Sequence, residues 1–181
     1  MVIVFLANGF EEIEALTTVD VLRRAGLTVQ TIGVGGVTIT GAHGLTVMAD
    51  CAGDDFVFAK DTAQAVVLPG GLPGTTNLSA SSLVRETLLE AHRQGVMVCA
   101  ICAAPSILGE LGILQGKSAT CYPGYEEQLL GAQPTGESVV SDGGCITAKG
   151  AGVTVDFALA IVARLVSPQK AREIGEAMQC R

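Results

Sequence analysis

The chain has 181 residues, of which 49% are apolar, and it carries a net charge of −7 at pH 7. This composition excludes intrinsic disorder, and we expect a single domain over residues 1–181. The negative charge disfavours nucleic acid as a partner. No apolar run reaches the roughly 18 residues of a membrane-spanning helix, and no basic segment of a signal peptide precedes the first strand, so we expect a cytoplasmic protein that binds no membrane.

The first half of the chain alternates predicted strands with predicted helices. Apolar runs at residues 2–6, 28–34, 65–68 and 96–101 are typical of buried parallel strands. A helix is predicted over residues 11–25, where apolar residues recur at helical spacing before Gly26, and another over residues 81–94, between Ser81 and Gly95. Residues 35–50 hold turn signals and two short β runs, which predict an antiparallel excursion from the sheet.

The second half of the chain continues the same alternation. A helix with Pro105 in its first turn follows the strand at 96–101. Gly143 and Gly144 lie between two β runs at 138–142 and 145–148, which predicts a hairpin. Residues 153–166 form a nearly all-apolar helix that we expect to be largely buried, and Ser167 and Pro168 begin a final helix.

This pattern predicts an α/β domain whose mostly parallel sheet carries helices on both faces. In such sheets, functional sites lie beyond the carboxyl ends of the strands. Three segments follow strand ends here: residues 7–10, the glycine-rich loop at 69–74, and the turn at Cys102. The sequence therefore predicts a site where these segments meet.

The turn at Cys102 carries the strongest chemical signal. The preceding strand passes directly into a helix, so Cys102 belongs to neither element. This is the arrangement of a nucleophile elbow with sulfur in place of a serine hydroxyl, and we expect the nearby helix N-terminus to favour the thiolate. The alternative is an unreactive, packed cysteine, because free cysteine is among the most buried residue types.

The chain has six cysteines, and reduced thiols are expected rather than a disulfide framework. Cys99 and Cys102 have the C-x-x-C spacing of a redox pair. That interpretation is disfavoured because Cys99 falls inside the predicted strand, where its neighbours would hold it. We expect no metal, since a structural zinc site needs a second closely spaced ligand pair.

Several groups are candidates to assist a thiol at Cys102. Glu14 lies one turn inside the first helix and can point toward the carboxyl edge of the sheet, where it could donate a hydrogen bond to the thiolate or move a proton. Gly70 and Gly71 would let a backbone N–H approach a bound oxygen, and with the N–H of Ala103 they could form an oxyanion hole. The alternative for both glycines is an ordinary turn.

The remaining polar candidates carry weaker signals. His43 and His92 are the two histidines, and neither closely follows the elbow, so a cysteine–histidine dyad is disfavoured. We expect Tyr122 to lie over the site, the alternative being a partly buried aromatic residue. Glu11 and Glu12 are interpreted as charges that complement the helix dipole.

Together these features resemble the ThiJ/PfpI superfamily, in the branch of the parkinsonism-associated protein deglycase and the bacterial YajL protein. The resemblance runs from Val2 to Val166 and rests on five blocks in order, at residues 9–14, 19–26, 68–71, 100–105 and 156–160. It implies a flavodoxin-like three-layer sandwich and a homodimer. Tyr122 stands where many relatives carry histidine, which disfavours a protease, and His43 lies near where close relatives have an arginine, which weakens any expectation of anion binding.

The resemblance also implies roles and an activity. Cys102 would be the reactive elbow cysteine, Glu14 its carboxyl partner, and Gly71 and Ala103 the backbone donors. The substrate pocket is expected to include Gly70, Ala104 and Tyr122. The expected function is a cofactor-independent glyoxalase or deglycase that acts on small dicarbonyls or glycated molecules. The alternative is a redox-sensing stress-response or chaperone-like protein with an oxidisable cysteine, because both functions need an accessible, ionisable thiol.

Overall fold

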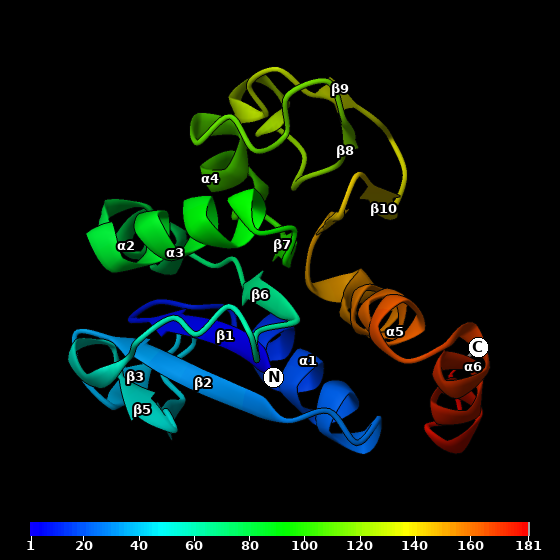
Figure 1. Ribbon diagram of the computed structural model, residues 1–181, viewed down its shortest axis with the longest axis horizontal. Coiled ribbons are helices and arrows are strands. Elements are labelled where there is room, and N and C mark those ends of the chain that lie inside the picture. Colours follow the sequence, from blue (N-terminus) through cyan, green and yellow to red (C-terminus); the bar gives the residue numbers. More distant parts are fainter. Residues whose placement is uncertain (181) are drawn as a thin grey trace.

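The computed structural model describes residues 1–180 and is built on a seven-stranded sheet (Figure 1). The strands follow the order β10-β11-β7-β6-β1-β2-β5. All neighbours are parallel except β10 and β11, which form the predicted hairpin. The strands are β1 (Val2–Ala7), β2 (Val29–Val34), β5 (Cys51–Ala52), β6 (Ala65–Leu68), β7 (Met97–Ile101), β10 (Val139–Asp142) and β11 (Cys145–Ala148).

Helices cover both faces of this sheet, as predicted. One face carries α1 (Glu12–Arg24) and α5 (Thr154–Leu165), with α6 (Pro168–Ala177) packed on α5. The other face carries α2 (Gly74–Ala80), α3 (Ser82–Arg93) and α4 (Pro105–Glu110). Among the described residues, no helix is both long and apolar enough to cross a membrane.

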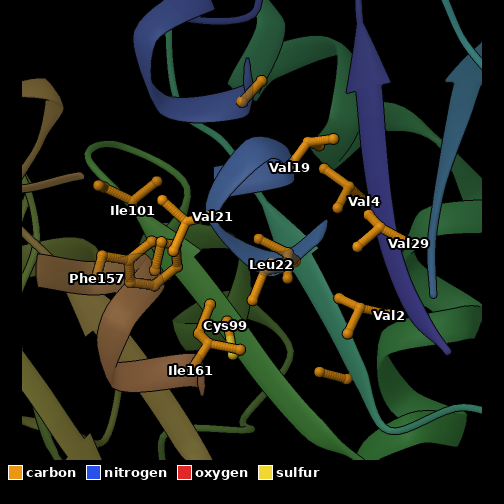
Figure 2. Close-up of a cluster of buried hydrophobic side chains, with 14 of the residues drawn as sticks. Val2, Val4, Val19, Val21, Leu22, Val29, Cys99, Ile101, Phe157 and Ile161 are labelled. Carbon is orange, nitrogen blue, oxygen red and sulfur yellow. The ribbon is translucent and has the colours of Figure 1, made fainter. Parts of the chain in front are cut away.

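The alternation of side chains along each strand divides the core into two clusters. Val4, Val67 and Cys99 lie in register on adjacent strands and face α1 and α5. Figure 2 shows Cys99 in this cluster near Ile161. The residues that alternate with these along each strand point to the opposite face of the sheet, where they pack against α2, α3 and α4. A strand buried on both faces reads as an unbroken apolar run, which explains why these strands were predictable.

The structure differs from the sequence prediction at α2, which follows the glycine-rich loop. Its sequence begins Gly-Thr-Thr-Asn, residues of low helix propensity. Tertiary contacts stabilise it instead: Leu78 is fully buried, and the Gly74 N–H donates to the Gly9 carbonyl at 3.0 Å. The α5 helix also differs, because Leu159, Ala160 and the nearby Ala163 remain half-buried.

Smaller elements extend from the sheet. The predicted excursion is the antiparallel pair β3 (Thr38–Thr40) and β4 (Thr46–Met48). A short parallel pair, β8 (Ser118–Ala119) and β9 (Gln133–Pro134), was not predicted, since strands of two residues carry no periodicity. Single-turn 3-10 helices lie at Gly53–Asp55, Glu126–Gln128 and Ala151–Val153.

Candidate active site

Cys102 occupies a strained turn between β7 and α4, which confirms the predicted elbow. Its φ is 66°, in the left-handed region that residues other than glycine rarely adopt. Two hydrogen bonds fix this backbone: the Cys102 N–H donates to Ala148 at 2.9 Å, and the Cys102 carbonyl accepts from the Tyr122 N–H at 2.8 Å. Strain that neighbouring segments hold in place is typical of functional sites.

The other cysteine of the C-x-x-C pair has a different environment. Cys99 is fully buried in the middle of β7, whereas Cys102 is half-buried beyond the end of the strand. All six cysteines are free thiols. Among the described residues, the one cluster spaced as metal ligands is Glu11, Glu12 and His43, and it contains no cysteine.

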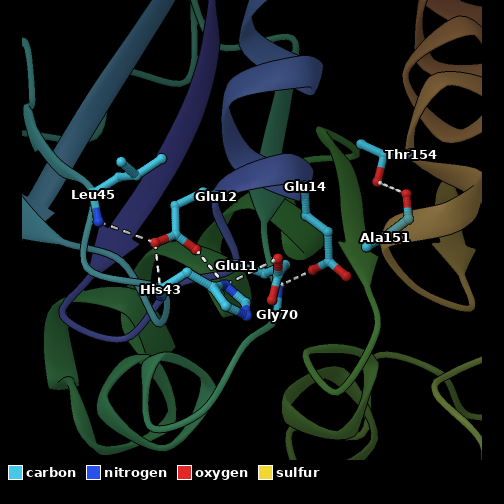
Figure 3. Close-up of polar contacts among 8 residues, drawn as sticks. All are labelled: Glu11, Glu12, Glu14, His43, Leu45, Gly70, Ala151 and Thr154. Atoms are coloured by element: carbon cyan, nitrogen blue, oxygen red, sulfur yellow. Dashed lines mark hydrogen bonds and ion pairs between the residues drawn. The ribbon is translucent and has the colours of Figure 1, made fainter.

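Glu14 reaches the elbow from the first turn of α1 and is 1% exposed. Its Oε2 accepts from the Gly70 N–H at 2.8 Å, the hydrogen bond drawn as a dashed line in Figure 3. Its Oε1 is buried with no conventional hydrogen-bond partner, and the polar group beside it is the Cys102 thiol. Burial raises the pKa of Glu14 to about 7.

The sulfur of Cys102 receives backbone N–H groups from Gly71 and Ala103. These hydrogen bonds lower the pKa of the thiol, but burial and then the negative charge of ionised Glu14 raise it. This corrects the expectation that a helix N-terminus favours the thiolate. The α4 helix has six residues and begins only at Pro105, so the donors to sulfur come from the turn and the neighbouring loop.

Glu14 and Cys102 titrate as a coupled pair. The pair releases its first proton near pH 7, later than a free carboxyl. The remaining proton is best placed on Glu14, because a charge on this buried carboxylate has one backbone N–H donor, from Gly70, whereas a charge on the sulfur has two, from Gly71 and Ala103. From there it donates to a thiolate that also accepts from Gly71 and Ala103. Every polar atom of the pair then has a partner.

Both loop glycines are required by close approach. A side chain at Gly70 would place its Cβ 2.6 Å from the Cys102 Cβ and 2.9 Å from Glu14 Oε2. Gly71 has φ +89°, and a Cβ there would lie 2.4 Å from the Glu11 N. The loop is tied to α1 by the Glu11 N–H, which donates to the Gly70 carbonyl at 2.9 Å.

The expected pocket residues separate into two groups. Tyr122 lies beside the elbow, half of its surface exposed, in the wall of a cavity of about 310 Å³. Ala104 lies elsewhere: it is fully buried in the core cluster under α4, so it lines no solvent-accessible surface. Its N–H donates to the Ile101 carbonyl at 3.1 Å and closes the turn.

Glu12 has a role that the sequence did not indicate. It is 5% exposed, and its carboxylate accepts from the His43 N–H at 2.8 Å, from the His43 ring at 2.9 Å and from the Leu45 N–H at 3.3 Å (Figure 3). Burial opposes its ionisation, but these hydrogen bonds lower its pKa overall. Glu12 thus anchors the β3–β4 excursion to α1. His92 is exposed.

The sequence analysis also did not identify the segment after β11 as part of the site. Gly150 is buried, a Cβ added to it would contact both Cys102 and Glu14, and it lines the same cavity as Tyr122. The rule for carboxyl strand ends would have found it, because β11 is parallel to β7 and ends at the same edge. The sequence showed only the antiparallel hairpin of β10 and β11, which does not indicate which strand neighbours β7.

Replacing Glu14 with Gln tests the raised pKa through stability. The carboxyl ionises near pH 4.5 in the unfolded chain, whereas in the folded protein the Glu14–Cys102 pair keeps both protons to near pH 7. Between these values the native state binds more protons, so stability falls as pH rises. We expect the free energy of unfolding of the wild-type protein to fall relative to Glu14→Gln by up to about 3 kcal/mol across this window, as measured by urea unfolding.

A carboxylate removed from an exposed loop, in Glu137→Gln, is the matched control. A difference between wild type and Glu14→Gln that stays constant from pH 4.5 to 7, or that shifts in favour of the wild type, contradicts the raised pKa.

This chain is similar to known proteins in both sequence and fold. A model of the DJ-1/PfpI family matches residues 1–164. The chain is 37% identical over 179 residues to Protein dj-1beta of Drosophila melanogaster, spanning 97% of this chain and 95% of that protein. It is 32% identical to a protein of Caenorhabditis elegans named glutathione-independent glyoxalase DJR-1.2, spanning 91% and 87%. The crystal structure of a DJ-1 superfamily protein from Salmonella typhimurium superposes with a TM-score of 0.92 at 33% identity, covering 99% and 98%. The chain therefore belongs to the DJ-1/PfpI family.

Proposed function

We propose that this protein is a cofactor-independent cysteine enzyme that converts small dicarbonyls to hydroxy acids without glutathione. The observation that carries the proposal is the free Oε1 of Glu14, buried beside the thiol of Cys102. A carboxyl poised near pH 7 next to a nucleophile suits proton transfer at neutral pH. The name of the Caenorhabditis elegans relative supports the same activity.

The reaction begins with the thiolate of Cys102. It adds to the aldehyde carbon of methylglyoxal, and Glu14 gives its proton to the carbonyl oxygen, which forms a hemithioacetal. Glu14, now ionised, removes the proton from that carbon and returns it to the neighbouring ketone carbon. The hydroxyl proton on the first carbon passes to the oxygen of the second, so the product is a thioester without any net oxidation. Water hydrolyses the thioester to lactate and frees the thiol. Glyoxal would give glycolate by the same steps.

The backbone donors have two tasks in this scheme. The N–H groups of Gly71 and Ala103 point at the sulfur in the free protein. When the sulfur bonds to carbon, negative charge moves to the substrate oxygen, and donors already fixed in the turn stabilise it without reorganisation. The same addition to an aminocarbinol or hemithioacetal on another molecule would remove a glycation adduct.

The second candidate is a redox sensor whose Cys102 becomes a sulfinic acid. The two N–H groups at the sulfur favour it, because they can donate to the oxygens of an oxidised sulfur. In both candidates we propose a cytoplasmic homodimer. Exposed apolar side chains on α1 and the β3–β4 excursion are available for such an interface: Ile13, Leu16, Leu45 and Met48.

Turnover of methylglyoxal by the pure protein tests the first candidate. We expect lactate formation without glutathione, its loss in Cys102→Ser, and a fall of roughly a hundredfold or more in Glu14→Gln, which loses the proton shuttle. Cys180→Ser, at an exposed position outside the site, is the control. Iodoacetamide should still alkylate Cys102 in Glu14→Gln.

No turnover by the wild-type protein, or equal turnover by Cys102→Ser, would refute the enzyme. Unchanged turnover in Glu14→Gln would leave that carboxyl with a structural role only.

Mild peroxide separates the two candidates. Two equivalents should convert Cys102 to the sulfinic acid, each peroxide being reduced to water. A disulfide with Cys99 is not expected, because Cys99 is fully buried within β7. We expect oxidation to abolish dicarbonyl turnover with no gain of activity, measured by mass spectrometry and by aggregation of an unfolding client protein. Suppression of aggregation by the oxidised form alone would favour the sensor.

A further inference from the structure

We propose that Gly150 sets the size of the substrate, because its missing side chain leaves the space that holds the group on the second carbonyl carbon. The inference rests on the proposed function and names its substrate class: 2-oxoaldehydes with a slim substituent. It starts from the surroundings of Gly150, a buried residue between β11 and the 3-10 turn Ala151–Val153.

The space above Gly150 touches each reacting group. A Cβ built at this position would lie 3.4 Å from Tyr122 Cδ2, 3.8 Å from Glu14 Oε1 and 3.9 Å from Cys102 Sγ. These are ordinary contact distances. The point is therefore open, and it lies one atomic contact from the nucleophile, from the free carboxyl oxygen and from the aromatic wall.

The chemistry places the second substrate carbon beside this point, in van der Waals contact with the Gly150 Cα, where an added Cβ would crowd it. That carbon is bonded to the carbon that Cys102 attacks, so it must lie close to the sulfur without being bonded to it. It also receives a proton from Glu14, so it must lie within reach of Oε1, the oxygen that Gly70 leaves free. A carbon that packs on the Gly150 Cα meets both conditions, because the space next to this Cα borders the Cys102 sulfur and Glu14 Oε1, and we place the substituent on that carbon over Gly150.

The backbone of Gly150 does not itself require glycine. Its φ is 160° and its ψ is −170°, which is extended backbone that any residue adopts. Gly71 differs, because its φ of +89° and its crowded surroundings exclude a side chain on conformational grounds. At Gly150 the missing Cβ therefore provides space, and an alanine can fold in the same backbone conformation.

A substituent that passes this point enters the cavity of about 310 Å³. Tyr122, Pro123 and Val153 are among its lining residues, and Lys149 is the one charged residue there. The cavity is therefore mostly apolar, and Gly150 is part of its wall. We expect a methyl group to fit over Gly150 and a branched substituent on the second carbon to contact the Tyr122 ring.

The test compares methylglyoxal with glyoxal, which carries hydrogen in place of the methyl group. In Gly150→Ala we expect the ratio of kcat/KM for methylglyoxal to kcat/KM for glyoxal to fall about tenfold, since one methylene discriminates roughly 10- to 200-fold in a fitted pocket. Gly136→Ala is the matched control, because that glycine has no positive φ and a Cβ added to it would meet no other atom within 4 Å. Its ratio should equal that of the wild type.

A second variant enlarges the space for the substituent, whereas Gly150→Ala reduces it. Tyr122→Ala removes the closest wall and should raise kcat/KM for phenylglyoxal relative to glyoxal. A ratio unchanged in both Gly150→Ala and Tyr122→Ala overturns the inference.

Alkylation of Cys102 distinguishes failure of this inference from failure of the proposed function. If the wild-type protein turns over no dicarbonyl, the proposed function fails, and the rates of iodoacetamide and N-ethylmaleimide then test the space alone. We expect Gly150→Ala to slow the bulkier reagent at least several-fold more than the smaller one. Equal slowing of both reagents overturns the claim that Gly150 controls size.

Discussion

The site depends on one buried carboxyl that has fewer hydrogen bonds than it needs. Glu14 is 1% exposed, and the Gly70 N–H satisfies one of its oxygens while the other faces the Cys102 sulfur. Burial of such a group is costly when it is charged, so the carboxyl keeps its proton well above the usual pKa of a glutamate. The proton that Glu14 retains makes a thiolate possible in surroundings that otherwise raise the pKa of the thiol.

The rest of the fold holds this pair together from separate parts of the chain. β7 ends at the elbow, the loop after β6 supplies Gly70 and Gly71, and α1 supplies Glu14. Parallel strands bring these segments to one edge of the sheet, where the Cys102 backbone is tied to β11 and to Tyr122. Two glycines are needed for close approach, and Gly150 leaves open the space in which we propose that the substrate binds.

Much of this arrangement could be predicted from local pattern. The buried strands, the elbow at Cys102 and the helix carrying Glu14 follow from apolar runs and helical spacing. The sequence pattern did not predict the features that depend on tertiary contacts. The poor helix formers of α2 fold because Leu78 is buried, Glu12 binds His43 across 31 residues, and the neighbour of β11 is set by sheet order. The helix N-terminus was expected to favour the thiolate and does not, because the sequence does not show how short α4 is. The sequence indicated Gly71 and Ala103 as donors to a bound oxygen, but not that they donate to the sulfur of the free protein.

The central claim is that Glu14 and Cys102 share one proton, with the negative charge on sulfur. The most direct measurement is the ultraviolet absorbance of the thiolate against pH, taken as the difference between the wild-type protein and Cys102→Ser. The account predicts that this absorbance appears with a midpoint below the ordinary pKa of a cysteine. A midpoint above about 8.5, the ordinary pKa of a cysteine, would place the charge on Glu14 and contradict the account.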